Sequence, residues 1–373
     1  MSLPPIWKVK REIRRIRDQA MLASTNLYEP FFRWRHKKWL TEIVKPISGE
    51  IILGEKVAIF ILFQPKGVAQ SIYFTCDHLI AQGYSPFILS NAPLSNTDRT
   101  ELLARSALLL ERPNFGYDFG AYQDGIRLLD RLGCKPDRLI LMNDSTWFPL
   151  RVNDTSIERM EASGDAFTGL IEKIEPDLRH HKGIDHLESH LLMFKGPALK
   201  CVPFAEFWKN YRASSNRTNT IVRGEKKISD TMFNAGFRSE GLLSRQKFLD
   251  RISLLSYDEL LGILIEFCDV RADVTYPIST LIKKAHDTPK WREDAIRQLG
   301  ELVFAQNYLL TTTFVFASMK YLGLGFVKKG HEKISHVTRQ KVLNLGAARK
   351  IEPIDPAVRA EMEQTVANWT PKK

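Results

Sequence analysis

The chain has 373 residues, of which 44% are hydrophobic and 26% are charged, and its formal net charge is +11. These values are typical of a folded protein with a sizeable core, and they exclude a chain that is disordered throughout. The excess positive charge indicates an anionic partner, such as a phosphorylated substrate, an acidic membrane surface or nucleic acid.

Residues 1–50 are basic and aromatic, with eleven Lys or Arg against five Asp or Glu. Arginines around Ile13 and Ile16 have the spacing of a helix. This helix either packs its few apolar residues on the main domain or rests on an anionic membrane face, aided by Trp34 and Trp39. Nucleic-acid binding is not predicted, because the sequence has no zinc finger, RNP-type motif or basic zipper.

The sequence favours a cytoplasmic protein. The first twenty residues lack the apolar stretch of a signal peptide. No apolar run reaches the length of about 18 residues that a membrane-spanning helix needs. The four cysteines contain no CxxC pair and indicate reduced thiols. We therefore expect a cytoplasmic location, with peripheral contact at the inner face of the cell membrane. The cysteines are Cys76, Cys134, Cys201 and Cys268.

Apolar runs of strand length alternate with helical segments from residue 56 onward. The runs are continuous, as expected for strands that are covered on both faces. The alternation predicts an α/β fold with a mostly parallel, doubly wound sheet and a helical C-terminal region. Strands are predicted at 57–63, 86–90, 107–111, 138–142, 166–170 and 191–194. Helices are predicted at 69–82, 97–106, 119–132, 157–163, 203–211, 227–235, 248–270 and 291–326.

The segment RPNFGYDFG, which begins at Arg112, is the first candidate for ligand binding. Gly116 permits close approach of the backbone, and Asn114 and Asp118 supply acceptor oxygens. Arg112 can pair with a phosphate, and the amides that open the next helix attract negative charge. The spacing differs from GxGxxG, so no dinucleotide fingerprint is predicted. The alternative is an ordinary turn between a strand and a helix.

The second candidate follows the apolar strand that ends near Met142. Asn143, Asp144 and Ser145 stand at its carboxyl end, where open α/β sheets bind ligands. One carboxylate with neutral oxygen side chains suits Mg²⁺ or Mn²⁺ on a diphosphate. Such a cation offsets the charge of a departing nucleoside diphosphate. The alternative is an Asx turn that ends the strand.

Five motifs occur in a defined order and resemble the rhamnan synthesis protein F family over about residues 56–245. The resemblance implies a GT-A-like glycosyltransferase of bacterial surface polysaccharide synthesis, with a sugar nucleotide such as dTDP-rhamnose and a glycan or lipid-linked acceptor. By the GT-A pattern, Asn143-Asp144-Ser145 takes the place of the metal-binding DxD, with Asn for its first Asp. The family often has Gln where this chain has Glu188. The motifs are RPNFGYDFGAYQDG, LILMNDSTWFPL, FTGLIE, HLESHLLMF and FAEFWKNY.

An inverting GT-A transferase needs a carboxylate that deprotonates the acceptor hydroxyl. The stretch from Gly224 to Gly236 is similar to the helix start that carries the ED pair in family 2 transferases. Counted back from Gly236, Glu225 falls on the Asp of that pair, so Glu225 is the predicted base. Asp185 and Glu188 are the reserve candidates. Glu225 has an alternative role as a charge that stabilises the start of a helix.

Together these observations predict a basic helical segment (1–50), a GT-A-like nucleotide-sugar domain (51–245) and a helical C-terminal region (246–373). The expected reaction moves a 6-deoxyhexose, rhamnose above all, to a growing glycan. Asp144, with Asn143, is expected to hold Mg²⁺ or Mn²⁺. The nucleotide is expected to touch Asn91, Arg112, Asn114, Gly116 and Asp118.

Two rival functions remain open. His186 and His190 are four residues apart and would share a helix face, which suits a zinc hydrolase, although no HExxH motif is present. The other rival is a non-catalytic scaffold that binds carbohydrate or nucleotide. Asn143 in the metal motif is the feature that supports this second rival.

Overall fold

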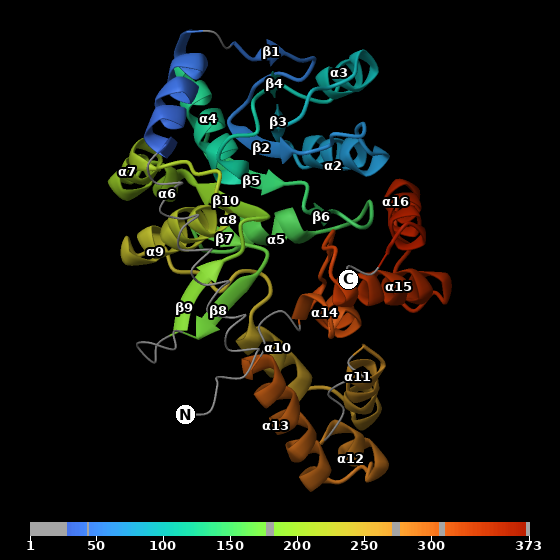
Figure 1. Cartoon of the computed structure of the whole chain (residues 1–373). Helices are drawn as coiled ribbons and strands as arrows, with labels where there is room; N and C mark the ends of the chain where they lie inside the picture. The colour runs from blue at the N-terminus through green and yellow to red at the C-terminus, as the bar shows by residue number, and fades with distance from the viewer. Residues whose placement is uncertain (1–27, 43–44, 177–182, 271–276, 306–309, 371–373) are drawn as a thin grey trace, which may run out of the picture.

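The computed structural model of the chain describes residues 28–42, 45–176, 183–270, 277–305 and 310–370 (Figure 1). The helix expected around Ile13 and Ile16 lies outside these residues. The described part is a mixed α/β fold with a seven-stranded sheet in the order β1, β4, β3, β2, β5, β10, β7. The strands are Ile47–Ser48 (β1), Lys56–Leu62 (β2), Ser85–Ser90 (β3), Leu108–Glu111 (β4), Arg138–Asn143 (β5), Phe167–Gly169 (β7) and Leu191–Lys195 (β10).

Most strands of the sheet point the same way. Neighbouring strands β4, β3, β2 and β5 pair in parallel. β10 runs antiparallel between β5 and β7, so β7 has the direction of β5. Only β10 and the edge strand β1 oppose the others within this sheet of the described structure. The expected mostly parallel sheet is therefore confirmed, and the reversal at β10 is a feature that the hydrophobic pattern did not reveal.

The central strand β2 has helices over both of its faces. Its residues from Val57 to Leu62 are all buried, which a parallel strand inside a layered fold requires. Because side chains alternate along a strand, Phe60 and Ile59 belong to different hydrophobic clusters. The cluster around Phe60 includes α2 and the C-terminal helices, whereas the cluster around Ile59 includes α4 and α7.

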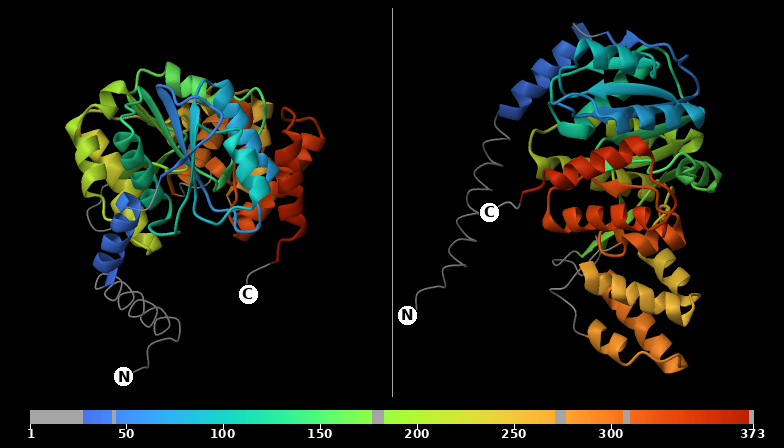
Figure 2. Two further views of the ribbon diagram at one scale, coloured as in Figure 1. Left: turned by 90° about the horizontal axis from the view of Figure 1, so that it is seen from above. Right: turned by 90° about the vertical axis from the view of Figure 1, so that its right-hand side faces the viewer.

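The helices predicted at 69–82, 97–106, 119–132, 157–163, 203–211 and 227–235 begin and end within three residues of these bounds, whereas the short helices at 196–199 and 217–220 were not predicted. Figure 2 shows them flanking the sheet on both sides. Ser95 caps α3, because its Oγ accepts the N–H of Asp98 at 3.0 Å. The helices are Gln70–Ala81 (α2), Asn96–Leu103 (α3), Tyr117–Arg131 (α4), Ser156–Ala162 (α5), Gly196–Leu199 (α6), Val202–Asn210 (α7), Arg217–Thr220 (α8) and Lys227–Asn234 (α9).

The C-terminal region has two parts. Helices α10 to α13 form a lobe at one end of the molecule, while α14 to α16 return to the sheet, where α16 packs against α2 (Figure 1). One hydrophobic cluster joins this region to the sheet, so the core continues across residue 245. The helices are Arg245–Ser253 (α10), Tyr257–Val270 (α11), Ile278–Lys283 (α12), Pro289–Ala305 (α13), Val315–Leu322 (α14), Lys333–Ala347 (α15) and Pro356–Ala367 (α16).

The two long helices expected at 248–270 and 291–326 are interrupted. The first divides because Ser256 and Glu259 form a capping box that begins α11. The Ser256 N–H donates to Glu259 Oε2 at 3.0 Å, and the Glu259 N–H donates to Ser256 Oγ at 3.3 Å. The second contains α13 and α14, and α14 ends at Gly323, whose φ of 67° is left-handed.

Two pairs of short strands were not predicted. β8 (Glu172–Pro176) pairs with β9 (Gly183–Leu187), and β6 (Thr146–Trp147) pairs with β11 (Val327–Lys328). His186 therefore lies in a strand, where its backbone pairs with that of Lys173, and His190 precedes β10. The expectation that the two histidines share a helix face is wrong, because strand pairing keeps this stretch extended.

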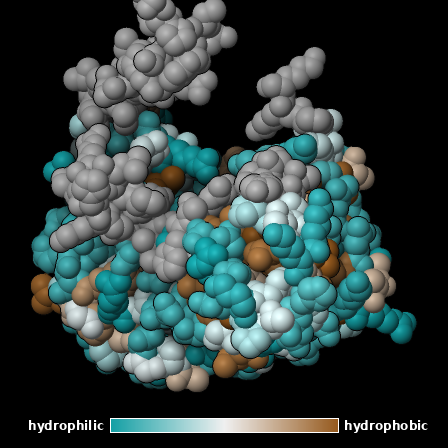
Figure 3. Space-filling view, turned by 90° about the horizontal axis from the view of Figure 1, so that it is seen from below, coloured by the Kyte–Doolittle hydropathy of each residue, from teal (hydrophilic) through white to brown (hydrophobic). Residues whose placement is uncertain are grey.

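A helix over residues 28–42 lies beside α4 and marks the start of the described chain. In the described ranges, no helix has both the length and the apolar character needed to cross a bilayer. The face of the molecule seen in Figure 3 is mainly hydrophilic, and its apolar side chains form separate small patches.

Candidate functional site

The order in which the chain adds parallel strands to the sheet reverses between β2 and β5. From β2 the chain continues to β3 and β4 on one side and then crosses to β5 on the other side. Open α/β sheets bind ligands at the carboxyl ends of the strands at such a switch point. Phe63 and Gln64 follow β2 here, and Asn143 and Asp144 stand at the end of β5.

Asp144 is held at the switch point by both strands. Its N–H donates to the carbonyl oxygen of Ile61 at 3.1 Å. Its Oδ2 accepts the N–H of Phe63 at 2.9 Å and Nε2 of Gln64 at 2.6 Å. The side chain is partly exposed and does not point into packed core. The carboxylate is therefore oriented at the edge where a ligand is expected.

Asn143 connects Asp144 with the first turn of α4. Its Nδ2 donates to Asp118 Oδ2 at 3.2 Å, and its Oδ1 accepts the N–H of Ser145 at 3.1 Å. Burial raises the pKa of Asp118 to about 6, although the Phe119 N–H lowers it by donating to this carboxylate. The negative charge of Glu225 raises the pKa further. The two motifs singled out in the sequence thus meet in space.

Gly116 shapes the start of α4. Its φ of 80° is left-handed, and an added Cβ would lie 2.9 Å from the Cβ of Ala213. A glycine is therefore required by both the turn and the close packing. Asn114 is exposed, and Tyr117 is exposed with a φ of 52°, which is uncommon for an aromatic residue.

Arg112 and Asn91 belong to a buried network rather than to an open phosphate site. Arg112 donates through Nε to Asp124 Oδ2 at 2.9 Å, through Nη1 to Asn91 Oδ1 at 2.5 Å and through Nη2 to the carbonyl oxygen of Phe115 at 2.7 Å. Burial lowers the pKa of Arg112, and Asp124 opposes that shift. Nε2 of His36 lies 2.7 Å from Asp124 Oδ2 and extends the network to the helix over residues 28–42. These buried contacts stabilise the turn between β4 and α4.

Glu225 faces Asp118 from the other side of the site. It lies in η1 (Ile221–Lys226), a π-helix, and its Oε2 accepts the N–H of Ser189 at 3.0 Å and Oγ of Ser189 at 2.6 Å. Its Oε1 lies 3.4 Å from Nε2 of His186. Burial alone would raise the pKa of Glu225, but hydrogen bonds from His186 and Ser189 outweigh burial and lower it. The carboxylate is therefore charged at neutral pH.

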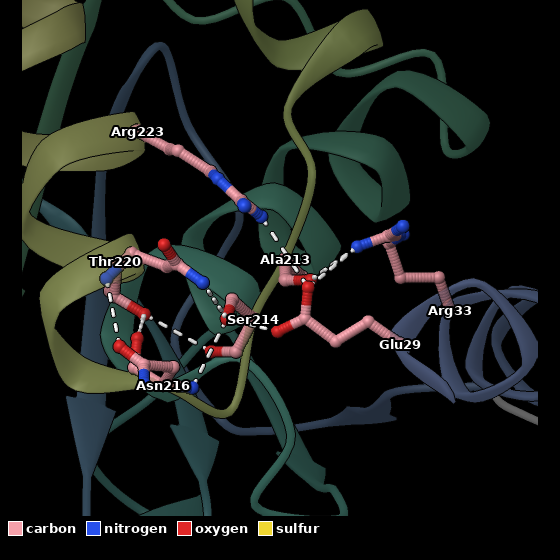
Figure 4. A network of polar contacts seen from close by, with 8 residues as sticks. Glu29, Arg33, Ala213, Ser214, Asn216, Thr220 and Arg223 are labelled. Atoms are coloured by element: carbon pink, nitrogen blue, oxygen red, sulfur yellow. Dashed lines mark hydrogen bonds and ion pairs between the residues drawn. The ribbon is translucent and has the colours of Figure 1, made fainter. Parts of the chain in front are cut away.

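The π-helix brings the backbone against the aromatic core. A Cβ on Gly224 would lie 2.5 Å from the Phe119 ring. Such helices often occur at functional sites, since the wider turn redirects side chains. Figure 4 shows that Glu29 anchors the preceding segment: it accepts hydrogen bonds from Ser214, from Arg33 at 3.0 Å and from Arg223 at 3.4 Å. The helix over residues 28–42 thereby supports the position of Glu225.

The reserve carboxylates have other partners. Asp185 forms an ion pair with Arg238. Glu188 accepts Nζ of Lys328 at 2.5 Å. Burial would raise the pKa of Glu188, but the charge of Lys328 outweighs burial and lowers it to about 2. Both carboxylates therefore serve ion pairs in this structure.

The two histidines lie in separate pairs. Nδ1 of His190 lies 3.4 Å from Glu188 Oε2, and its ring packs on Phe326 with centroids 4.8 Å apart. Burial lowers the pKa of His190 to about 4, against the effect of Glu188. Among the residues that the structure describes, no three His, Cys, Asp or Glu side chains converge as metal ligands. This arrangement does not favour the zinc hydrolase.

Three polar residues at this edge were missed by sequence reasoning. Gln64 directly follows β2, so the strand pattern could have indicated it. Lys328 and Lys329 come from the C-terminal region: Lys328 pairs with Thr146 across β6 and β11, and the Lys329 N–H donates to the Ser145 carbonyl oxygen at 2.8 Å. In the sequence, Lys328 and Lys329 appear as a basic pair that follows an apolar run, and this pattern alone does not indicate a site.

Comparison with known proteins agrees with the motifs. Residues 87–261 match the model of the family described as rhamnan synthesis protein F. The match covers slightly less than half of the chain and shows a similarity to that family over this region. Asp118, Asn143, Asp144, Ser189 and Glu225 all lie inside the matched range.

A relative in Sinorhizobium fredii (strain NBRC 101917 / NGR234), the uncharacterized protein y4gN, is 30% identical over 211 residues. The alignment covers 56% of this chain and 52% of that protein. The chain therefore spans about half the length of this curated relative.

The buried network predicts the effect of removing Arg112. Arg112→Met leaves the Asp124 carboxylate without its guanidinium partner, so we expect a loss of about 3–5 kcal/mol in the free energy of unfolding. Urea denaturation measures this change. The control Arg297→Met removes two exposed ion pairs, with Asp294 and Glu301, and should leave the free energy of unfolding nearly unchanged. A stable Arg112→Met variant with weakened nucleotide binding would instead assign Arg112 to a phosphate.

The π-helix predicts that position 224 does not tolerate a side chain. Gly224→Ala forces a methyl group against Phe119, and we expect a loss of about 1–3 kcal/mol in stability, measured by urea denaturation. Gly262, in α11, has open space around it. Gly262→Ala is therefore the matched control and should be neutral or slightly stabilising. Equal stability of the two variants would contradict the tight packing at Gly224.

The raised pKa of Asp118 predicts a pH-dependent cost to stability. Because its folded-state pKa of about 6 exceeds the ordinary value of 3.8 for an aspartate, ionisation of Asp118 destabilises the fold as pH rises through this window. Asp118→Asn removes the cost. We expect thermal melting to show a higher Tm than the wild type at pH 8 and a similar Tm at pH 4. A constant difference between the two proteins at all pH values would contradict this origin.

Proposed function

We propose that this chain is a glycosyltransferase of GT-A type that moves a sugar from a nucleoside diphosphate donor to a glycan. The observation that carries the proposal is the position of Asp144 at the β2–β5 switch point, oriented by Phe63 and Gln64. Asn143, next to Asp144 in the chain, donates to Asp118, and the charge of Glu225 acts on Asp118. The match of residues 87–261 to the rhamnan synthesis protein F family supports a role in polysaccharide synthesis.

The donor is proposed to lie over the carboxyl ends of β2 and β5, with its diphosphate near Asp144. One carboxylate and a neutral amide, completed by phosphate oxygens and water, fit Mg²⁺ or Mn²⁺, so Asp144 and Asn143 would hold the ion. The ion would offset negative charge on the diphosphate. Lys328 and Lys329 add positive charge at the same edge and favour the anionic leaving group. Tyr117, exposed at the start of α4, offers a ring for stacking.

Glu225 is proposed as the general base for an inverting displacement. Its lowered pKa keeps the carboxylate deprotonated at neutral pH, which is the state that a general base must have before the reaction. As that proton leaves the acceptor hydroxyl, the acceptor oxygen bonds to the anomeric carbon. The bond from this carbon to the diphosphate oxygen breaks, and its electron pair leaves with the nucleoside diphosphate. Ser189 and His186 orient the carboxylate through its two oxygens.

The proposed donor sugar is rhamnose or another 6-deoxyhexose, carried by a nucleotide such as dTDP, and the acceptor is a surface polysaccharide or a lipid-linked glycan. A cytoplasmic location at the inner membrane face fits such an acceptor. Trp34 is 60% exposed on the helix over residues 28–42 and suits contact with an anionic membrane. Trp39, by contrast, packs against the core and against His36. Trp34 alone of this pair is therefore available to a membrane.

Replacement of the two central carboxylates tests the proposal. Asp144→Ala should reduce transfer by about 100-fold or more and leave the fold intact, because the side chain is partly exposed. Glu225→Gln should reduce turnover by roughly 100-fold or more with little change in donor affinity. Release of nucleoside diphosphate from a panel of sugar nucleotides with Mn²⁺ measures turnover, and thermal shift measures donor binding.

Asp137→Ala is the matched control, because Asp137 is exposed next to the other end of β5 and carries only a surface ion pair. It should retain wild-type turnover. Full activity of Asp144→Ala would refute the placement of the diphosphate. Donor binding without turnover in the wild type, with every acceptor tried, would favour the non-catalytic scaffold.

A further inference from the structure

A second groove lies away from the candidate site, between the helix over residues 28–42, α4 and α7. Its volume is about 870 Å³, within the range of small-molecule sites. Leu139, at the start of β5, lines it, whereas Asp144 follows the other end of that strand. Five residue steps separate Leu139 from Asp144, and at about 3.3 Å each they place this part of the groove roughly 17 Å from Asp144. The groove is therefore separate from the proposed donor site.

The groove combines an apolar floor with a cationic rim. Leu40, Ile126, Leu139, Phe204 and Trp208 form much of the floor. Six lysine or arginine residues line the groove, against a single acidic residue, Asp130. An apolar channel with this rim matches a molecule that has a hydrocarbon chain and an anionic head group. The cationic residues are Lys37, Arg127, Arg131, Lys135, Lys200 and Lys209.

The helix that borders the groove also carries an exposed aromatic cluster, in its N-terminal half before the residues that line the groove. Tyr28, Phe31, Phe32 and Trp34 are between 43% and 60% exposed, and neighbouring rings among them are in contact. Aromatic side chains beside lysines and arginines are typical of segments that lie in the interface of a bilayer. This neighbouring surface favours a lipid that is still part of a membrane as the occupant.

We infer that the groove binds an acyl chain of an anionic membrane phospholipid, whose phosphate is held by the lysine rim. The inference does not depend on the proposed transferase activity. It assigns Lys37, Lys135 and Lys209 to head-group contact and Leu40 and Phe204 to contact with the chain. The bound lipid anchors the helix over residues 28–42 against the bilayer.

Cys134 lines the groove and reports its occupancy. Burial raises the pKa of the Cys134 thiol and also that of the Cys268 thiol, which lies in α11 outside the groove. Vesicles that contain phosphatidylglycerol should slow alkylation of Cys134 by N-ethylmaleimide and leave Cys268 unchanged, as followed by peptide mass mapping. Pure phosphatidylcholine vesicles should protect neither thiol. Equal alkylation of Cys134 with and without the anionic vesicles would overturn the inference.

Charge reversal tests the rim by vesicle co-sedimentation of the full-length chain. The triple variant Lys37→Glu, Lys135→Glu and Lys209→Glu should weaken binding to phosphatidylglycerol vesicles by about tenfold or more. The matched control Lys283→Glu, Lys284→Glu and Lys333→Glu makes the same charge change on exposed lysines outside the groove. It should bind nearly as the wild type does.

Circular dichroism and thermal melting establish that both triple variants are folded. Equal weakening of the two would indicate attraction by net charge alone and would overturn the site. Faster alkylation of Cys134 after deletion of residues 1–27, without any lipid, would show that the chain's own N-terminus fills the groove. That result would also overturn the inference.

Discussion

The rest of the site depends on the contact that joins β2 and β5 at their carboxyl ends. A carboxylate is costly to remove from water unless donors satisfy it, and Asp144 receives two, from Phe63 and Gln64. Because β2 and β5 are parallel neighbours at a switch in strand order, this contact opens toward a ligand rather than toward a connecting loop. Asn143 then extends the network to Asp118.

Two carboxylates in this network have opposite environments. Burial outweighs the hydrogen bonds at Asp118 and raises its pKa to about 6, whereas hydrogen bonds outweigh burial at Glu225 and lower its pKa. At neutral pH the Glu225 carboxylate is therefore deprotonated, whereas Asp118 becomes protonated as pH falls through about 6. The contacts of Glu225 with the Ser189 hydroxyl and with His186 lower its pKa and keep it deprotonated. The protonation state of Glu225 therefore depends on how β9 and η1 pack together.

Segments outside the family-matched range complete the structure. The helix over residues 28–42 contributes His36 to the Asp124 network and Glu29 to the segment before η1. The C-terminal region contributes Lys328 to Glu188 and shares a hydrophobic cluster with the sheet. The same N-terminal helix also borders the second groove. One helix thus connects the surface that we assign to lipid with the support of Glu225.

The sequence was sufficient to predict the six longer strands of the main sheet and the helices of seven or more residues up to about residue 235, since apolar runs, turn residues and helix lengths act within one element. It also indicated that Asp118 lies at the start of a helix and that Asp144 follows a strand. Only the tertiary structure decided that Arg112 is satisfied internally, that β10 reverses direction and that Lys328 pairs with Glu188. These outcomes depend on segments far away in the sequence, which supply the hydrogen-bond donors and bury the polar groups. The free energy of a polar contact depends on that burial.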